Sequence, residues 1–268
     1  MEISDFDWRI YGVTTTTQDL PAAGPGTSYH PVGTPVYPAT VAEWDSTRFL
    51  FGTPSALKIA YDIALTASIE ALIAKERVQL IPHSGGVMVT PEGFPHLYNY
   101  FERYMISTVF SLLTLEIFCN FTISSILTKK TVLLKLEKKP KYYSAIELQK
   151  SNISIITKLL VILPKILSTP SIETANPQLW EKIKELNTLR VKITHMKSMD
   201  ISSGALIDRD SVFAEIINNT PVKSPFYILN VMDYYKSGVL FNNWIEQMRN
   251  QYSTRFQALL KTHAKNIA

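Results

Sequence analysis

Arg190 and His195 are the residues of this chain whose types and spacing best fit a chemical task. A histidine has an unperturbed pKa of about 6.5, so it can act as a general acid or base near neutrality. An arginine can hold a phosphate in two-point contact and stabilise the negative charge that develops on it. RNA cleavage without a metal ion needs both groups, because the 2′-hydroxyl must lose a proton and attack the adjacent phosphate. We therefore predict that Arg190 binds phosphate and that His195 transfers protons.

Both residues stand near the end of a helix that the apolar periodicity predicts over 176–199. Five residues of an ideal helix turn by roughly 140°, so the two side chains do not share one narrow face. They can converge on one groove if the helix bends, or if a second copy of the helix lies alongside it. A simpler interpretation also fits the pattern: an exposed arginine, and a histidine near a helix C-terminus, where positive charge is favourable.

Two short motifs resemble those of a known family. Arg190, followed after four residues by His195, resembles the R-x4-6-H signature of HEPN domains, and the run from Glu116 to Asn120 resembles a Glu-x-Phe-x-Asn run of larger HEPN proteins. The resemblance implies a HEPN-like helical bundle from about Pro95 onward. It also implies a metal-independent endoribonuclease of a bacterial toxin or phage-defence type, without a cofactor, which acts as a homodimer with two motif helices facing each other across a cleft. RNA would be the substrate, and an antitoxin or defence-system protein would be a further partner.

Glu116 and Asn120 are four residues apart, so they share one face of a helix. The resemblance implies that they belong to the catalytic site and orient Arg190 or the substrate. The alternative is a polar pair that satisfies donors in the core. Both interpretations predict that the two side chains are buried.

The densest positive charge lies between Lys129 and Lys141, in a segment that we predict to be a loop, and Tyr142 and Tyr143 follow its last lysine. Lysines with aromatic neighbours can follow a phosphate backbone and stack on bases, although a lysine-rich connection is often only a solvated loop. We predict that RNA is bound by lysines of this loop and of the motif helix, namely Lys138, Lys139, Lys141, Lys192 and Lys197.

Two other functions stay open. The first is a catalytically inactive HEPN-like module that binds RNA or protein; Val191 favours it, because active family members often have a polar residue after the arginine. The second is a membrane-associated protein, since Met105–Leu127 is long enough to cross a bilayer. Glu116 near the middle of that segment would cost about 2.5–3.5 kcal/mol on insertion scales. We therefore predict a core helix and no membrane contact.

The composition is that of a folded globule, with 46% hydrophobic and 19% charged residues among 268. A net charge of +4 permits RNA binding without demonstrating it. Cys119 is the single cysteine, and the first residues form no hydrophobic run, which together favour a reducing, cytoplasmic location. No histidine or cysteine spacing fits a zinc site, so we predict no metal.

The fold is predicted to be mainly α. Residues 1–93 form an N-terminal region with an irregular arm rich in proline and threonine, one helix over 54–78, and a short β-hairpin around Ser84-Gly85-Gly86. Residues 94–268 form the HEPN-like helical domain. Its helices are predicted over 95–128, 144–168, 176–199, 209–219, 224–236 and 240–264. Pro164 should kink the second of these helices or end it early.

Overall fold

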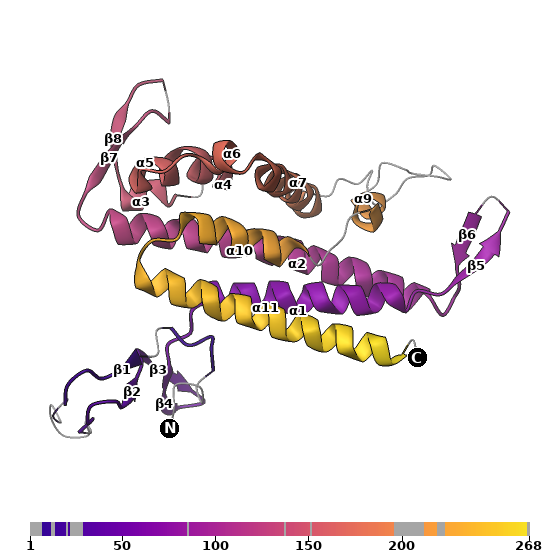
Figure 1. Cartoon of the computed structure of the whole chain (residues 1–268), viewed down its shortest axis with the longest axis horizontal. Coiled ribbons are helices and arrows are strands. Elements are labelled where there is room, and N and C mark those ends of the chain that lie inside the picture. The colour runs from indigo at the N-terminus through magenta and orange to yellow at the C-terminus, as the bar shows by residue number, and fades with distance from the viewer. Residues whose placement is uncertain are drawn as a thin grey trace. The chain divides into compact units, whose positions relative to one another are not determined.

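The computed structural model describes residues 7–11, 14–19, 21, 29–84, 86–136, 138–150, 152–195, 212–218 and 223–266 (Figure 1). The chain divides into two compact units, Met1–Ile59 and Ala60–Ala268. Helices account for most of the described residues, so the prediction of a mainly α protein is confirmed.

The first unit contains more strand than the predicted irregular arm. In its described part, β1 (Thr14–Thr15) pairs with β2 (Pro35–Val36), and β3 (Ala39–Trp44) pairs with β4 (Thr47–Gly52), both antiparallel. Asp45 and Ser46 join β3 to β4 with positive φ angles of 48° and 63°. Two successive left-handed residues give a turn whose twist matches that of the strands. The hairpin therefore forms although neither turn residue is a glycine.

The second unit is built around α2 (Phe94–Ile126), which contacts α3 (Ala145–Leu148), α5 (Leu163–Leu167), α7 (Pro177–Thr194), α9 (Val212–Asn218) and α10 (Lys223–Tyr235). Among the described residues, α2 is the helix long and apolar enough to cross a membrane, yet more than half of its most apolar window is buried inside the unit. Ser107, Ser111 and Thr114 are among its buried residues, and such small side chains allow neighbouring helices to approach closely. This burial favours the predicted core helix over a membrane span.

Two further helices of the described chain lie beside α2. One is α1 (Ala56–Glu76), whose first turn belongs to the first unit and whose Glu70 pairs with Arg103 of α2. The other is α11 (Gly238–Asn266), whose Phe241 ring packs against Phe118 of α2. Arg255 ties α11 to α1, because its guanidinium donates hydrogen bonds of 2.6 Å to Asp62 and Thr66. The predicted helices 54–78, 224–236 and 240–264 agree with these bounds to within two residues.

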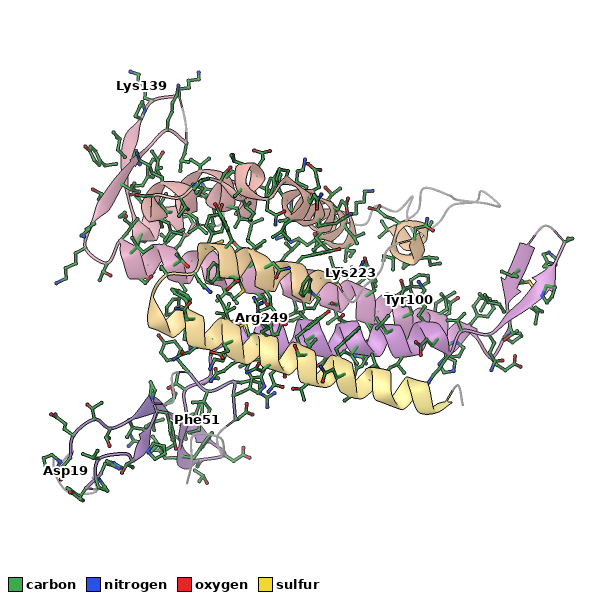
Figure 2. The ribbon with its side chains drawn as sticks, in the orientation of Figure 1. Asp19, Phe51, Tyr100, Lys139, Lys223 and Arg249 are labelled. Carbon is green, nitrogen blue, oxygen red and sulfur yellow. The ribbon has the colours of Figure 1, made fainter. Side chains whose placement is uncertain are left out.

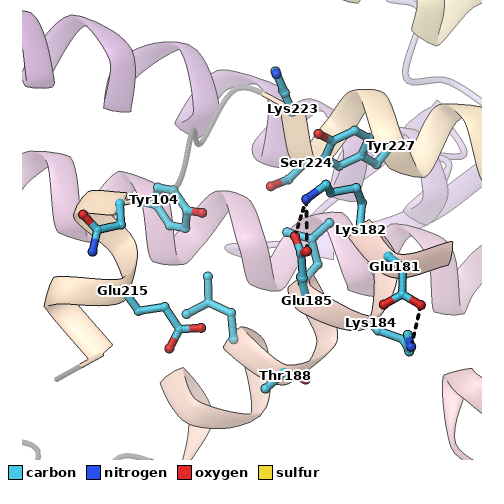
Figure 3. Close-up of a pocket in the computed structure, with 13 residues that line it drawn as sticks. Tyr104, Glu181, Lys182, Lys184, Glu185, Thr188, Glu215, Lys223, Ser224 and Tyr227 are labelled. Atoms are coloured by element: carbon cyan, nitrogen blue, oxygen red, sulfur yellow. Dashed lines mark hydrogen bonds and ion pairs between the residues drawn. The ribbon is translucent and has the colours of Figure 1, made fainter. Parts of the chain in front are cut away.

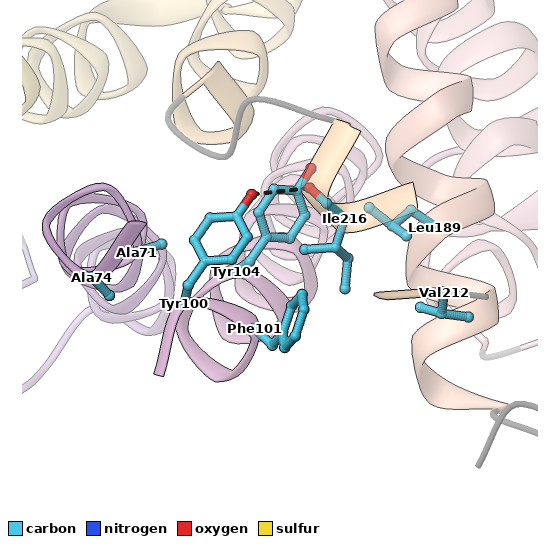
Figure 4. Packing of buried hydrophobic residues seen from close by; sticks show 8 residues of the cluster. All are labelled: Ala71, Ala74, Tyr100, Phe101, Tyr104, Leu189, Val212 and Ile216. Atoms are coloured by element: carbon cyan, nitrogen blue, oxygen red, sulfur yellow. Dashed lines mark hydrogen bonds between the residues drawn. The ribbon is translucent and has the colours of Figure 1, made fainter. Parts of the chain in front are cut away.

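A buried cluster fixes the end of α7 (Pro177–Thr194) and the short α9 (Val212–Asn218) to the centre of the unit (Figure 4). The Tyr100 hydroxyl of α2 donates a hydrogen bond of 2.9 Å to the Ile216 carbonyl of α9. Leu189, the residue before Arg190, is buried in the same cluster. The cluster comprises Ala71, Ala74, Tyr100, Phe101, Tyr104, Leu189, Val212 and Ile216.

Two hairpins leave the helices. The one formed by β5 (Leu80–His83) and β6 (Gly86–Val89) confirms the short hairpin predicted in this region. The other, β7 (Thr131–Leu134) with β8 (Lys141–Ser144), stands where we predicted a basic loop. Threonine, valine and tyrosine favour strands, but the many lysines of the segment obscured that signal.

The predicted helix 144–168 is divided into α3 (Ala145–Leu148), α4 (Ile155–Thr157), a π-helical turn (Lys158–Ile162) and α5 (Leu163–Leu167), and α6 (Ile172–Ala175) follows. In the π-helical turn the Leu163 N–H donates to the Lys158 carbonyl, five residues back. Pro164 has no N–H to continue the ladder. The Leu159 carbonyl instead accepts a hydrogen bond of 2.7 Å from the Tyr235 hydroxyl of α10. The proline therefore perturbs this helix, as predicted, and a tyrosine replaces the missing donor.

Candidate functional site

Arg190 and His195 occupy the end of α7. The helix begins at a proline, and the Asn176 side chain caps it by accepting a hydrogen bond of 3.1 Å from the Leu179 N–H. It ends at Thr194, with His195 as the C-cap residue at φ −125° and ψ 37°. The predicted helix continued to residue 199, but residues 196–199 lie outside the described part of the chain. His195 has thus left the helix, and its side chain is exposed.

Arg190 lies on the packed side of α7. It follows Leu179, Ile183 and Leu186 at spacings of four, three and four residues, and these three leucine and isoleucine side chains are buried. The arginine side chain is half-buried, whereas His195 is exposed at the helix end. The two side chains therefore differ in environment: Arg190 is partly covered within α7, whereas His195 is exposed at its C-cap.

Glu116 and Asn120 share one face of α2, as predicted, but their partner is Lys158 of the π-helical turn. The Lys158 Nζ lies 3.3 Å from Oε1 of Glu116 and 2.8 Å from Oδ1 of Asn120. Lys158 is fully buried, but the Glu116 side chain is about one third exposed and Asn120 is also only partly buried, so the predicted burial of both side chains is not met. No hydrogen bond or ion pair within the described residues joins Arg190 to this pair. Within the described residues, Glu116 and Asn120 thus do not orient Arg190. They have the alternative role, because they satisfy a buried donor of the core, the Lys158 ammonium.

Lys158 is a site residue that our sequence analysis missed. A buried ammonium is unfavourable unless it is paired and hydrogen-bonded, and here the carboxylate and the amide oxygen meet that need. The sequence does contain a signal: Lys158 is the single charged residue in the apolar run from Ile155 to Leu163. Its partners are not readable from the sequence, since they lie about forty positions away on another helix.

Cys119 lies between Glu116 and Asn120 in the sequence and is completely buried. Burial raises the pKa of its thiol to about 12, although the positive charge of nearby Lys158 opposes the shift. The thiolate is the nucleophilic form of cysteine. At neutral pH Cys119 is thus a neutral core residue rather than a nucleophile.

The predicted RNA-binding lysines have different environments. Lys192 of α7 lies 2.5 Å from Glu215 of α9, so its charge is already paired. Lys138 and Lys139 are exposed between β7 and β8. Lys141 lies 3.2 Å from Glu147 and 4.9 Å from the ring centre of Tyr143. Lys197 lies outside the described residues.

A pocket of about 720 Å³ lies among α2, α7, α9 and α10 (Figure 3). Tyr104 and Ser224 contribute to its wall, and burial holds the pKa of Tyr104 above its usual range. The α7 side of the pocket carries two ion pairs, Glu181–Lys184 at 2.7 Å and Lys182–Glu185 at 2.8 Å. Neither Arg190 nor His195 lines it. The paired charges of this wall favour neither an anion nor a cation. The pocket cannot be predicted from the sequence, because four separate helices supply its wall.

Within the described residues, no group of three or more histidine, cysteine, aspartate or glutamate side chains is placed to hold a metal ion. Comparison with protein families, with curated proteins and with solved structures finds no match to this chain.

Proposed function

We propose that this chain is a metal-independent endoribonuclease with a HEPN-like helical bundle, in which Arg190 holds the scissile phosphate and His195 transfers protons. The observation that carries the proposal is the end of α7, where an exposed histidine follows a half-buried arginine within two helical turns.

The reaction that these groups can support begins at the RNA 2′-hydroxyl. A base removes its proton, the oxygen attacks the adjacent phosphorus, and the 5′-oxygen leaves after it receives a proton. His195 suits either proton transfer, and the Arg190 guanidinium can pair with two phosphate oxygens as negative charge builds on them. Neither step requires a metal ion or a cofactor.

A homodimer would bring the two groups together. Because five residues of an ideal helix separate two side chains by roughly 140°, the arginine of one copy and the histidine of the other can complete one site. Val191 lies between them in the sequence and is 43% exposed, so apolar surface is available where two copies would meet. A cytoplasmic toxin or phage-defence role, with a partner protein that restrains the nuclease, would be in keeping with such an activity.

A second function is favoured by a different observation. Lys158 engages both Glu116 and Asn120, the residues that the family resemblance assigns to the catalytic site. If Glu116 and Asn120 only stabilise the buried Lys158, the bundle is a catalytically inactive module that binds RNA or a protein partner. Val191, in the position after the arginine, favours the same alternative.

Cleavage of a mixed RNA pool in EDTA tests the first proposal. We expect His195→Ala and Arg190→Ala each to lower the cleavage rate by about 100-fold or more, as for the loss of a general acid or a phosphate contact. His83→Ala and Arg77→Ala replace exposed residues of the same types elsewhere and should cleave like the unmodified chain. Equal cleavage by all variants would overturn the assignment. RNA binding without cleavage by any of them would establish the inactive module.

Mixing the two inactive variants tests the shared site. A dimer of one His195→Ala chain and one Arg190→Ala chain contains one complete site and one doubly deficient site. Random exchange of subunits should then restore about a quarter of the unmodified activity. No recovery, although subunits exchange, would exclude a site that is shared between copies.

A further inference from the structure

Positive charge is concentrated in one short part of the chain. Residues 127–150 contain seven lysines and two glutamates, whereas the entire chain has a net charge of only +4. The segment comprises the β7–β8 hairpin and its flanks, and one of the two glutamates, Glu147, is already paired with Lys141. The remainder of the protein is nearly neutral, so the field that attracts a polyanion originates mainly here.

The two faces of the hairpin differ. Val132 pairs with Tyr143 and Leu133 pairs with Tyr142 across the strands, and successive residues of a strand point to opposite faces. Tyr143 is buried at 6% exposure, whereas Tyr142 is 64% and Leu133 46% exposed. The outer face therefore presents a tyrosine ring beside a leucine, and the inner face packs on the unit.

Lysines surround this outer pair. Lys129 and Lys130 precede β7, Lys135 follows it, and Lys138 and Lys139 lie in the connection to β8, where Figure 2 shows Lys139 at the projecting end of the hairpin. All five are exposed. Among the described residues the structure gives none of these five ammonium groups a carboxylate partner.

We propose that the outer face of the β7–β8 hairpin binds single-stranded RNA, an inference that rests on the proposal that this chain acts on RNA. Tyr142 stacks on a base, Leu133 contacts the same base or its neighbour, and the surrounding lysines pair with phosphates. The substrate is single-stranded because a duplex hides the faces of its bases, whereas an unpaired base can leave its stack and lie on an aromatic ring.

The arrangement of charge favours a nucleic acid over a membrane surface. A hairpin that inserts into a bilayer must lead with apolar side chains, whose burial in the acyl region supplies the affinity. Here the tip carries Lys135, Lys138 and Lys139, and the apolar pair lies behind it on the strands. Lysines at the tip and an aromatic ring on the face match a phosphate chain with bases attached.

Fluorescence anisotropy with a labelled 2′-O-methyl oligouridine tests the proposal. The probe has about 20 nucleotides, which is longer than the stretch of RNA that one hairpin can cover. The probe lacks the attacking hydroxyl, so binding is measured whether or not the chain proves to be a nuclease. Tyr142→Ala should weaken binding roughly 5- to 150-fold, the loss expected for one stacked base. Tyr98→Ala is the matched control, because Tyr98 of α2 is 62% exposed and lies outside the hairpin. It should bind like the unmodified chain.

Salt dependence tests the lysines. Replacing both Lys138 and Lys139 by alanine should weaken binding and reduce the slope of log affinity against log salt by about 1.4, which is 0.7 for each lost contact to a single strand. Lys165→Ala, an exposed lysine of α5, should leave the slope unchanged. A duplex of the same length should bind more weakly than the single strand.

Two results would overturn the proposal. The first is that Tyr142→Ala and Tyr98→Ala bind the single strand with equal affinity. The second is that the hairpin variants lose binding to phosphatidylserine vesicles but keep their binding to the RNA probe. Retained binding of the probe by a chain that does not cleave RNA would reject the nuclease and leave this surface intact. If the chain cleaves RNA but Tyr142→Ala binds the probe as tightly as the unmodified chain, the nuclease proposal stands and the hairpin surface is rejected.

Discussion

The ammonium of Lys158 lies 2.8 Å from the amide oxygen of Asn120, inside the contact between α2 and the π-helical turn. Glu116, one turn earlier on α2, contributes its carboxylate to the same ammonium. A charged group can be buried at this position because it is paired and hydrogen-bonded. The three residues therefore link the π-helical turn before Pro164 to the central helix of the unit.

Removing the Lys158 side chain should destabilise the fold. We expect Lys158→Ala to lower the free energy of unfolding by about 3 kcal/mol, since it leaves a cavity and takes the partner from two polar groups. Lys158→Met keeps the length without the charge and should cost clearly less. Urea unfolding followed by circular dichroism measures both, with Lys165→Ala at an exposed site as the control. An unchanged midpoint for Lys158→Ala would contradict the role given to the pair.

Tyr235 should contribute to stability through its hydroxyl. That group donates to the Leu159 carbonyl and accepts a hydrogen bond of 2.8 Å from the Ile172 N–H. Tyr235→Phe leaves two buried backbone groups without partners and should cost about 2–4 kcal/mol. Tyr234→Phe is a close control, because the Tyr234 hydroxyl donates to Pro170 at an exposed position and its loss should cost less than about 1 kcal/mol. Thermal unfolding that ranks the two variants in the opposite order would refute this assignment.

The thiol of Cys119 should be a reporter of unfolding. It is completely buried and its pKa is raised to about 12, so the folded chain should not react with a thiol reagent such as Ellman's reagent at neutral pH. In denaturant one equivalent should react at once. The native reaction rate is therefore expected to follow the population of unfolded chain as urea is added. Rapid reaction without denaturant would show that the interior around α2 is open to solvent.

Lys58 should make the stability of the first unit depend on pH. Burial lowers the pKa of its ammonium from 10.5 to about 8, and Asp7 opposes the shift. Between pH 8 and pH 10.5 the unfolded chain therefore binds more protons at this site than the folded chain, so stability should rise with pH across that window. Below pH 8 both states are protonated and the cost of the buried charge is fully present.

Urea unfolding of the chain and of Lys58→Met, monitored by the ellipticity of the β-strands, measures this effect. The stability of the unmodified chain relative to Lys58→Met should increase as pH rises from 8 to 10.5. The comparison cancels the titration of the other lysines and tyrosines. A difference that stays constant over that range would mean that Lys58 keeps an ordinary pKa.

Local features of the sequence were sufficient to predict the main helices and one hairpin. The apolar periodicity of α1, α2, α10 and α11 and the Ser84-Gly85-Gly86 turn each act over a few neighbouring residues, so their outcome can be read along the chain. Pro164 was likewise recognised as a perturbation, because a missing N–H is a local fact. The spacing of Glu116 and Asn120 correctly placed both on one helical face.

Tertiary structure decided which residues of those elements contact one another. Lys158 meets Glu116 and Asn120 across 42 and 38 positions of the sequence, and no periodicity specifies that partner. The strands β7 and β8 are supported by the burial of Leu134 and Tyr143 against the unit, which turns a lysine-rich segment into a hairpin with a distinct outer face. A helix or turn is encoded by adjacent residues, whereas a buried ion pair or a half-exposed strand depends on which surfaces meet when the chain packs.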